Sequence, residues 1–382
     1  MVYQPFHIHI ADEVLSDLRR RLEQMRWPDA LADTGWSYGT NADYLRELTT
    51  YWREHYDWRA QESLLNTFPQ FQTEIAGIQL HFLHVKGTGP SALPLLISHG
   101  WPGSFFEMYK IIGPLTDPAR YGGDPADAFD VIVPSLPGFG FSGPTRERGI
   151  TIARIAEVFV SLMRELGYQR FAAQGGDWGS YVSSTLGQTY PDNLIGIHLN
   201  MLPSRWMVAL EPANAEERRW QELRAEWSAE EAGYSHIQGT RPQSLAYGLN
   251  DSPGGLAGWI IEKFQAWSDC HGDLESVFTK DELLTNIMIY WVTQTINSSL
   301  RIYYETTHQS ETLTTRIEVP TGIAVFPAEI TIAPRSMPQR LYNLQRWTEM
   351  SAGGHFAALE QPQALVEDIR AFFRSLRSAE AH

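Results

Sequence analysis

Gly175-Gly176-Asp177-Trp178-Gly179 is the stretch that decides the fold, because it has the form Gly-x-Asp-x-Gly. The pattern Gly-x-nucleophile-x-Gly turns a strand sharply into a helix and lifts the central side chain clear of the sheet. Glycines are needed two residues before and two after, because the turn is crowded and a Cβ atom at either position would collide. The sequence therefore predicts a buried strand at residues 171–173, a presented carboxylate at Asp177, and a helix that ends before Pro191.

An aspartate at the centre of such a turn, in place of serine, limits the chemistry available to it. The ester that an aspartate nucleophile forms has its acyl carbon in the enzyme. Asp177 would therefore attack an electrophilic sp³ carbon, such as that of an epoxide or alkyl halide, and not a substrate carbonyl. The alternative is a helix N-cap aspartate after a glycine turn, which a single motif match leaves open.

Length, composition and charge restrict the class of protein. A chain of 382 residues can form one large core with an inserted lid, or two to three domains of about 150 residues each. The 43% hydrophobic content and abundant aromatic residues indicate a well-buried globular enzyme. A net charge of −15, with no basic cluster beyond residues 19–21, disfavours nucleic acid and anionic membranes as partners. The single cysteine, Cys270, excludes an intramolecular disulfide and a cysteine-based zinc site.

The sequence shows no clear targeting signal, dinucleotide-binding motif or metal-binding motif. Residues 1–5 show no signal-peptide pattern, and no window reaches about 18 uninterrupted apolar residues, so we expect a cytoplasmic protein. The segment Gly138–Gly143 matches the dinucleotide fingerprint, but Pro144 follows and no helix opens there. There is no His-Glu-x-x-His motif, and His81 and His84 fall on opposite faces of a strand. We expect neither a cofactor nor a metal.

The order of the predicted helices and strands changes after about residue 85. Before that point, two amphipathic helices at 12–25 and 41–55 precede an antiparallel hairpin at 71–75 and 80–85. Beyond it, strands alternate with helices, which implies a mostly parallel sheet covered by helices on both faces. The expected elements of this series are strands at 95–98, 131–133, 171–173, 194–197, 322–326 and 347–350, a helix at 151–166, and a closing helix through 365–376.

Residues 203–314 interrupt this series with a mainly helical pattern rich in tryptophan and tyrosine. Because the segment lies inside the series, we interpret it as a lid inserted into an α/β core. The expected division is an N-terminal extension at 1–70, a core at 71–202 and 315–382, and a helical lid at 203–314. The oligomeric state, including a homo-oligomer, is left open by the sequence.

A nucleophile elbow requires a base and an orienting acid, in the order nucleophile, acid, histidine. His355 lies late in the chain, after a predicted strand, in a loop that two glycines make flexible, Gly353-Gly354-His355. Glu329 directly follows the strand at 322–326, where a carboxylate could reach the imidazole and fix its tautomer. The alternative for Glu329 is a surface ion pair with Arg335.

The turn His99-Gly100-Trp101-Pro102 follows the first core strand and could build an oxyanion hole. The backbone N–H groups of Trp101 and of Trp178, which follows the nucleophile, are its expected donors. The Trp101–Pro102 bond is a candidate cis peptide. We expect His99 to be structural.

With these residues in place, the chain resembles the α/β-hydrolase-fold epoxide hydrolases, and most closely the microsomal-type branch with its N-terminal extension, without the membrane anchor. The likeness covers nearly the whole chain, and its segments are 26–28, 56–59, 99–104, 175–180, 249–253, 262–264, 326–329 and 353–356. The resemblance implies two lid tyrosines that bind the epoxide oxygen, and their motifs match Tyr234 and Tyr303. Tyr304 is adjacent, so the choice of Tyr303 rests on the motif.

The expected activity is a cofactor-free opening of a small apolar or aryl epoxide by Asp177, followed by hydrolysis of the ester by water that His355 and Glu329 activate. The nearest alternative is a haloalkane or haloacid dehalogenase, which shares the aspartate and histidine but needs halide-binding donors and no tyrosine pair. A hydrolase-fold binding protein without turnover belongs to a different class. An ordinary esterase is disfavoured, because Asp177 would have to form an anhydride.

Overall fold

The computed structural model describes residues 3–309 and 315–380, so the expected end of the lid at 314 lies outside the described residues. The strands that it describes form one nine-stranded sheet in the order β1-β2-β3-β5-β4-β6-β7-β8-β9. Their bounds are β1 Gln4–Pro5, β2 Gln70–Ile75, β3 Ile78–Val85, β4 Leu93–Ser98, β5 Phe129–Pro134, β6 Phe171–Gly175, β7 Leu194–Leu199, β8 Ile317–Val325 and β9 Tyr342–Glu349.

The direction of the strands changes at β5. Strands β1, β2, β3 and β5 pair antiparallel, with Ile75 opposite Ile78 at the hairpin turn. From β5 to β9 every neighbouring pair is parallel, so the carboxyl ends of β4, β6, β7 and β8 meet at one edge of the sheet. Every residue of β5, β6 and β7 is buried, as expected for a parallel sheet covered on both faces.

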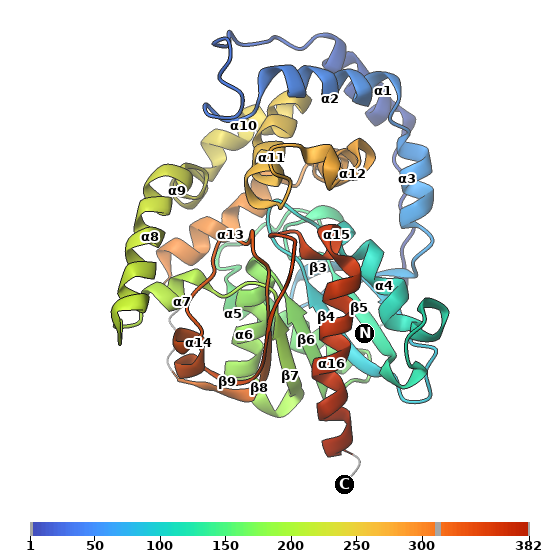
Figure 1. The fold of residues 1–382 in the computed structure, drawn as a ribbon. Coiled ribbons are helices and arrows are strands. Elements are labelled where there is room, and N and C mark those ends of the chain that lie inside the picture. Colours follow the sequence, from blue (N-terminus) through green and yellow to red (C-terminus); the bar gives the residue numbers. More distant parts are fainter. Residues whose placement is uncertain (1–2, 310–314, 381–382) are drawn as a thin grey trace.

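Helices cover both faces of this sheet (Figure 1). The amphipathic helix α5, Ile152–Glu165, packs on α6, Trp178–Thr189, which contacts β4, β6, β7 and β8. On the opposite face α4, Tyr109–Thr116, and the C-terminal helix α16, Pro362–Glu380, contact β5, β7 and β8. Two short helices, α14 at Ser336–Leu341 and α15 at Ala357–Glu360, complete the core. The predicted fold class, a mostly parallel sheet with helices on both faces, is confirmed.

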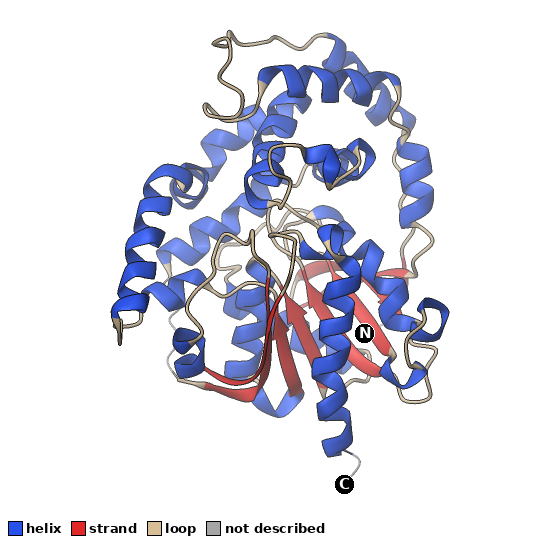
Figure 2. Ribbon diagram, viewed as in Figure 1, coloured by secondary structure: helices blue, strands red, loops and turns tan. Residues whose placement is uncertain are grey.

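The segment between β7 and β8 is helical throughout its described part and lies over the carboxyl edge of the sheet, with the strands confined to the other half of the molecule (Figure 2). Its helices are α7 Ser204–Val208, α8 Ala215–Glu231, α9 Gly233–Thr240, α10 Pro242–Asp251, α11 Pro253–Trp267, α12 Lys280–Thr293 and α13 Ile296–His308. We call this segment the lid. Helix α13 packs against α9 and α10, so the lid forms one layer above the core.

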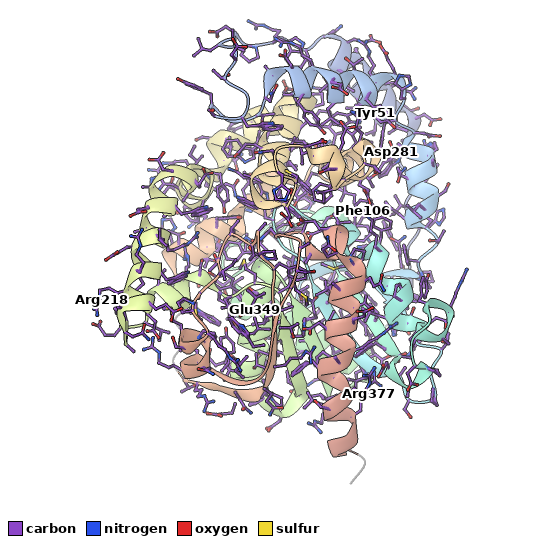
Figure 3. All side chains as sticks on the ribbon, viewed as in Figure 1. Tyr51, Phe106, Arg218, Asp281, Glu349 and Arg377 are labelled. Atoms are coloured by element: carbon purple, nitrogen blue, oxygen red, sulfur yellow. The ribbon has the colours of Figure 1, made fainter. Side chains whose placement is uncertain are left out.

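The N-terminal helices α1 Asp12–Glu23 and α2 Ala42–Glu54 lie on the outer side of the lid, and α3 Trp58–Leu65 runs from there down toward the sheet (Figure 1). The Tyr51 hydroxyl of α2 donates to Asp281 of α12 at 3.0 Å, and the two side chains lie together in Figure 3. The Tyr56 hydroxyl is 3.0 Å from Thr285 Oγ1, also on α12. Trp52 is buried beneath these contacts. Two hydroxyl contacts therefore join the N-terminal segment to α12 of the lid.

The structure differs locally from the elements expected from the sequence. Helix α3 was not expected, although Asp57 caps it by accepting from the amides of Arg59 and Ala60. Helix α1 ends at Glu23, two residues before the expected end at 25. Strand β9 begins at Tyr342, well before the expected residue 347. The glycine-rich segment at 138–143 forms a 3₁₀ turn, Gly140–Ser142, without an α-helix, and its Gly138 carbonyl accepts from Ser298.

Candidate active site

The turn around Asp177 has the strained geometry that the sequence predicts. Strand β6 ends at Gly175 and helix α6 begins at Trp178, which leaves Asp177 at φ 47° and ψ −127°. A Cβ atom on Gly175 would lie 2.2 Å from the Gly179 carbonyl oxygen, and one on Gly179 would lie 1.9 Å from the Ser98 carbonyl oxygen. Such contacts are impossible for any other residue, so both glycines are required.

The Asp177 carboxylate is held from two sides. Its Oδ1 accepts a hydrogen bond of 2.7 Å from the Trp101 backbone N–H. Its Oδ2 lies 3.5 Å from His355 Nε2. The turn that carries Trp101 can approach the Asp177 carboxylate only because residue 100 is glycine. A Cβ atom on Gly100 would lie 2.0 Å from Oδ1. The Trp101–Pro102 peptide is cis.

His355 is oriented by Glu329. Its Nδ1 is 2.8 Å from Glu329 Oε1, which also accepts from the Ile330 backbone N–H at 2.7 Å. Glu329 is buried and pairs with His355 instead of Arg335. The structure thus brings Asp177, His355 and Glu329 into one line, with the proton on Nδ1 directed at Glu329 and Nε2 facing Asp177.

The charge of His355 depends on these two carboxylates. Burial would lower the pKa of this imidazole, but the negative charges of Glu329 and Asp177 and their hydrogen bonds hold it well above its ordinary value. The two carboxylates therefore favour the imidazolium form of His355 in the resting site. If Asp177 lost its charge by becoming an ester, one of the two groups that raise this pKa would be removed.

The loop that carries His355 is fixed by backbone contacts with the lid. The His355 N–H donates to the Trp267 carbonyl at 2.8 Å, and a Cβ atom on Gly354 would lie 2.6 Å from that same oxygen. Glu360 accepts three backbone hydrogen bonds of 2.8–2.9 Å, from Asp269, Gly354 and Phe356. Gly354 therefore allows the loop to approach the lid closely, and these hydrogen bonds hold the loop in place.

Tyr234 of α9 and Tyr303 of α13 lie side by side over Asp177. Their ring centroids are 5.9 Å apart, and the Tyr303 ring is 4.8 Å from that of Trp178. Burial and the nearby charge of Asp177 raise the pKa of both phenols, so both remain protonated hydrogen-bond donors. Tyr303 is 5% exposed, whereas Tyr304 is 38% exposed and stacks on His308. Of the two adjacent tyrosines, only Tyr303 faces the site.

Lys263 of α11 was missed by sequence reasoning. It is buried, its ammonium lies 4.5 Å from the centroid of the Tyr234 ring, and it pairs with Glu262. A cation over the ring face stabilises negative charge on that phenol. The only sequence signal for Lys263 was its place in segment 262–264, one of the segments that resemble the family. That segment alone does not show that Lys263 packs against Tyr234.

A cavity of about 550 Å³ opens above Asp177 between the lid and the core. Asp177, Tyr234 and Tyr303 line it together, and about half of the other lining residues are aromatic or aliphatic while the rest are polar or charged. A pocket of this size suits a small organic substrate. His355 does not line this cavity.

A second, much smaller cavity of about 20 Å³ lies on the side of Asp177 that faces His355. Its polar lining comes from Asp177, His355, Glu107, Asn200, Gln174 and His99. The space is sufficient for one water molecule with several hydrogen-bond partners. Asp177 thus separates a substrate-sized cavity that contains the tyrosines from a water-sized cavity that contains the histidine.

Glu107 in the second cavity was also not predicted. It belongs to the 3₁₀ turn Phe105–Met108, and its carboxyl group takes the space that the missing side chain of Gly103 leaves free. Burial raises its pKa to about 8, so it is protonated at neutral pH. The only sequence signal was a position eight residues after His99.

His99 has a structural role. Its Nε2 accepts from the Leu136 backbone N–H at 3.1 Å, and its Nδ1 is 3.0 Å from the Gly100 carbonyl. Burial lowers its pKa to about 4, so the ring is neutral and ties two strand-end loops together.

The fold and this site define an α/β hydrolase. A parallel sheet with helices on both faces carries a nucleophile on a strained strand–helix turn, and the orienting acid and the histidine follow strands later in the chain. Residues 94–233 match the family model "alpha/beta hydrolase fold", in agreement with this architecture.

Residues 3–108 match the family model "Epoxide hydrolase N terminus". The chain is 40% identical to "Epoxide hydrolase 1" of Sus scrofa over 406 aligned residues, which cover 97% of this chain and 88% of that protein. The structure of juvenile hormone epoxide hydrolase from the silkworm Bombyx mori superposes with a TM-score of 0.88 at 31% identity, covering 99% of this chain and 96% of the other. The structure of Aspergillus niger epoxide hydrolase gives 0.86 at 30% identity, covering 98% and 97%. The chain belongs to the epoxide hydrolase family.

Within the described ranges, none of the helices is both long and apolar enough to cross a membrane.

Proposed function

We propose that this epoxide hydrolase works through a covalent ester on Asp177. The observation that carries the proposal is the position of Asp177 between two cavities, one lined by Tyr234 and Tyr303 and the other by His355. A two-step reaction needs this separation, because the alkyl group fills the first cavity while water attacks from the second.

The first step is ring opening. Tyr234 and Tyr303 hydrogen-bond the oxirane oxygen, and an oxygen of Asp177 attacks a ring carbon, so that a C–O bond forms as the ring C–O bond breaks. The developing alkoxide takes a proton from one phenol, which leaves a phenolate. Donors placed where this charge develops stabilise the transition state, and Lys263 beneath the Tyr234 ring favours that phenolate.

The second step is hydrolysis of the ester. Once the ester has formed, Asp177 no longer raises the pKa of His355, so the imidazolium yields its proton, which returns to the phenolate. Neutral His355 then removes a proton from a water held beside Glu107 in the second cavity, and this water attacks the Asp177 carboxyl carbon. The oxyanion is held by the Trp101 N–H, for which the 2.7 Å contact to Oδ1 is the support, and by the Trp178 N–H. Collapse of the tetrahedral intermediate breaks the bond between the carboxyl carbon and the diol oxygen, and His355 gives its proton to that oxygen as the diol leaves. The Asp177 carboxyl group then loses its remaining proton to His355, which restores the carboxylate and the imidazolium.

The main alternative, dehalogenation, is less well supported. Halide release requires donors arranged around a leaving ion, whereas two phenols on one side of Asp177 suit an oxygen that remains attached to the substrate. Halide release that survives Tyr303→Phe would favour the dehalogenase. Binding of epoxides without any diol formation would favour the non-catalytic alternative.

The proposal is tested by trapping the intermediate in His355→Gln. Ring opening does not need a neutral histidine, so this variant should accumulate protein heavier by the mass of one epoxide, measured by intact-protein mass spectrometry with styrene oxide. Asp177→Ala is the matched control and should gain no mass. Normal diol production by His355→Gln would contradict the assignment of the base.

A further inference from the structure

The large cavity contains more positive charge than its proposed reaction requires. Its charged lining residues are Asp177 at the site and two arginines, Arg205 of α7 and Arg224 of α8. Asp177 is the only carboxylate in this lining. The chain as a whole carries a net charge of −15, so the charge balance of this wall is opposite to that of the molecule.

Arg224 is half-buried and poorly partnered. Its guanidinium lies 3.9 Å from the centroid of the Trp227 ring and donates one long hydrogen bond, of 3.4 Å, to the Ile330 carbonyl. A guanidinium has five N–H donors. Within the described part of the chain, Arg224 takes part in no ion pair. Burial lowers its pKa, because the loss of hydration outweighs the attraction of the nearby Tyr234, Tyr181 and Glu329, none of which forms an ion pair with it.

The lack of a partner is specific to this position on α8. Arg219, on the same helix but outside the cavity, pairs with Glu222 at 3.2 Å and lies 3.7 Å from Glu226. The residues one turn from Arg224 that also line the cavity are Gln221 and Ser228, which are neutral. A charge that enters a cavity without a carboxylate is positioned to receive one from a ligand.

Arg205 has fewer N–H groups free to bind a ligand than Arg224 has. Its guanidinium already donates to the Thr306 carbonyl and to Thr307 Oγ1, each at 3.0 Å, and its side chain is exposed. Arg224 lies deeper, and its charge is felt by Tyr234, Tyr181 and Glu329. Of the two arginines, Arg224 is therefore the better anchor for a bound anion.

We propose that the cavity binds epoxides that carry a carboxylate at the end remote from the oxirane, with Arg224 as the ion partner of that carboxylate. This inference rests on the proposed epoxide hydrolysis at Asp177. The substrate would have an apolar body, matching the walls formed by Trp178, Met201, Val208 and Ile330. The planar guanidinium, backed by the Trp227 ring, would donate two parallel hydrogen bonds to the carboxylate.

The test compares two series of ω-epoxy substrates of increasing chain length, alkanoic acids and their primary amides, which are neutral and nearly isosteric. We expect the wild-type kcat/KM to favour the acid over the amide at one range of lengths by about 10- to 100-fold, as a charge-assisted hydrogen bond provides. Arg224→Gln should reduce this acid-to-amide ratio to about one, and Arg224→Lys should leave an intermediate ratio. Arg219→Gln, which alters α8 outside the cavity, should leave the ratio unchanged.

Each other outcome overturns a defined part of the proposal. Equal kcat/KM for acid and amide at every length, with diol formed from both, would overturn the carboxylate site and leave epoxide hydrolysis intact. An equal loss for both series in Arg224→Gln would assign Arg224 a general electrostatic role instead. Absence of diol from either series and from styrene oxide would refute the proposed function itself. If Arg224→Gln fails to fold by circular dichroism, the ratio measured in Arg224→Lys decides the question.

Discussion

His355 lies between two carboxylates, at 2.8 Å from Glu329 and 3.5 Å from Asp177, and its proton affinity follows from both. The two acids have different fates in the proposed reaction, because Asp177 becomes neutral in the ester while Glu329 keeps its charge. The imidazole can therefore be charged in the resting enzyme and become a base only after the first step. Glu329 then stabilises the imidazolium that forms again as water is deprotonated.

The variant Glu329→Gln separates the effect of Glu329 on the pKa of His355 from that of Asp177. Loss of the Glu329 charge should lower the pKa of His355, so the acidic limb of the hydrolysis rate moves to lower pH. The rate of hydrolysis should fall by roughly 100-fold or more, since the imidazolium is less well stabilised, while ring opening persists. Rapid-quench mass spectrometry measures both steps. Equal slowing of ring opening and hydrolysis would argue against an orienting role confined to the histidine.

Glu107 makes stability depend on pH. Its folded-state pKa of about 8 lies above the ordinary value of 4.5. Its contribution to stability is therefore fully present below pH 4.5 and is lost as pH rises through 8, by an amount on the order of a few kcal/mol. Glu107→Gln cannot ionise, so its Tm relative to the wild type should rise between pH 5 and pH 9. A constant difference in Tm across this range would contradict the assignment of a neutral buried carboxyl group.

At the scale of elements, the N-terminal helices hold the lid in place. Helix α2 contacts α11 and α12, and its Leu48 and Trp52 side chains are buried. These contacts lie far from Asp177, yet α12 packs on the turn that contains Glu107. Contacts through α12 therefore connect the N-terminal helices with the turn that contains Glu107.

Trp52→Ala should lower the free energy of unfolding by about 3–5 kcal/mol, because a large buried side chain is removed. Tyr51→Phe, which removes only the half-exposed hydrogen bond to Asp281, should cost about 1 kcal/mol or less. Urea denaturation followed by tryptophan fluorescence and by circular dichroism measures both. An unchanged midpoint for Trp52→Ala would show that the extension does not stabilise the lid.

Elements that a local pattern encodes were predictable from the sequence. The strand–turn–helix around Asp177, the hairpin at residues 70–85 and helix α5 each follow from spacing within one segment. Helix α3 was missed because its eight residues are shorter than the window over which apolar periodicity is clear. The division into extension, core and lid stays a prediction.

At the scale of the whole molecule, the candidate site combines segments that are far apart in the sequence. The pairing of Glu329 with His355 could be expected from strand order, since both follow strands whose carboxyl ends share one edge of the sheet. Glu107 and Arg224 could not, because their significance lies in cavities whose walls come from segments far apart in the sequence. The catalytic roles assigned to Asp177, Glu329, His355, Tyr234 and Tyr303 remain proposals that kinetics must test.

A single turnover in ¹⁸O-labelled water tests the covalent role of Asp177 most directly. With enzyme in excess over styrene oxide, water attacks the ester at the carboxyl carbon, so one ¹⁸O atom should enter the Asp177 side chain and the diol should carry none. Peptide mass spectrometry of residues around 177 locates the label. An unlabelled Asp177 together with ¹⁸O in the diol would mean that water attacks the epoxide directly, and would contradict the ester mechanism.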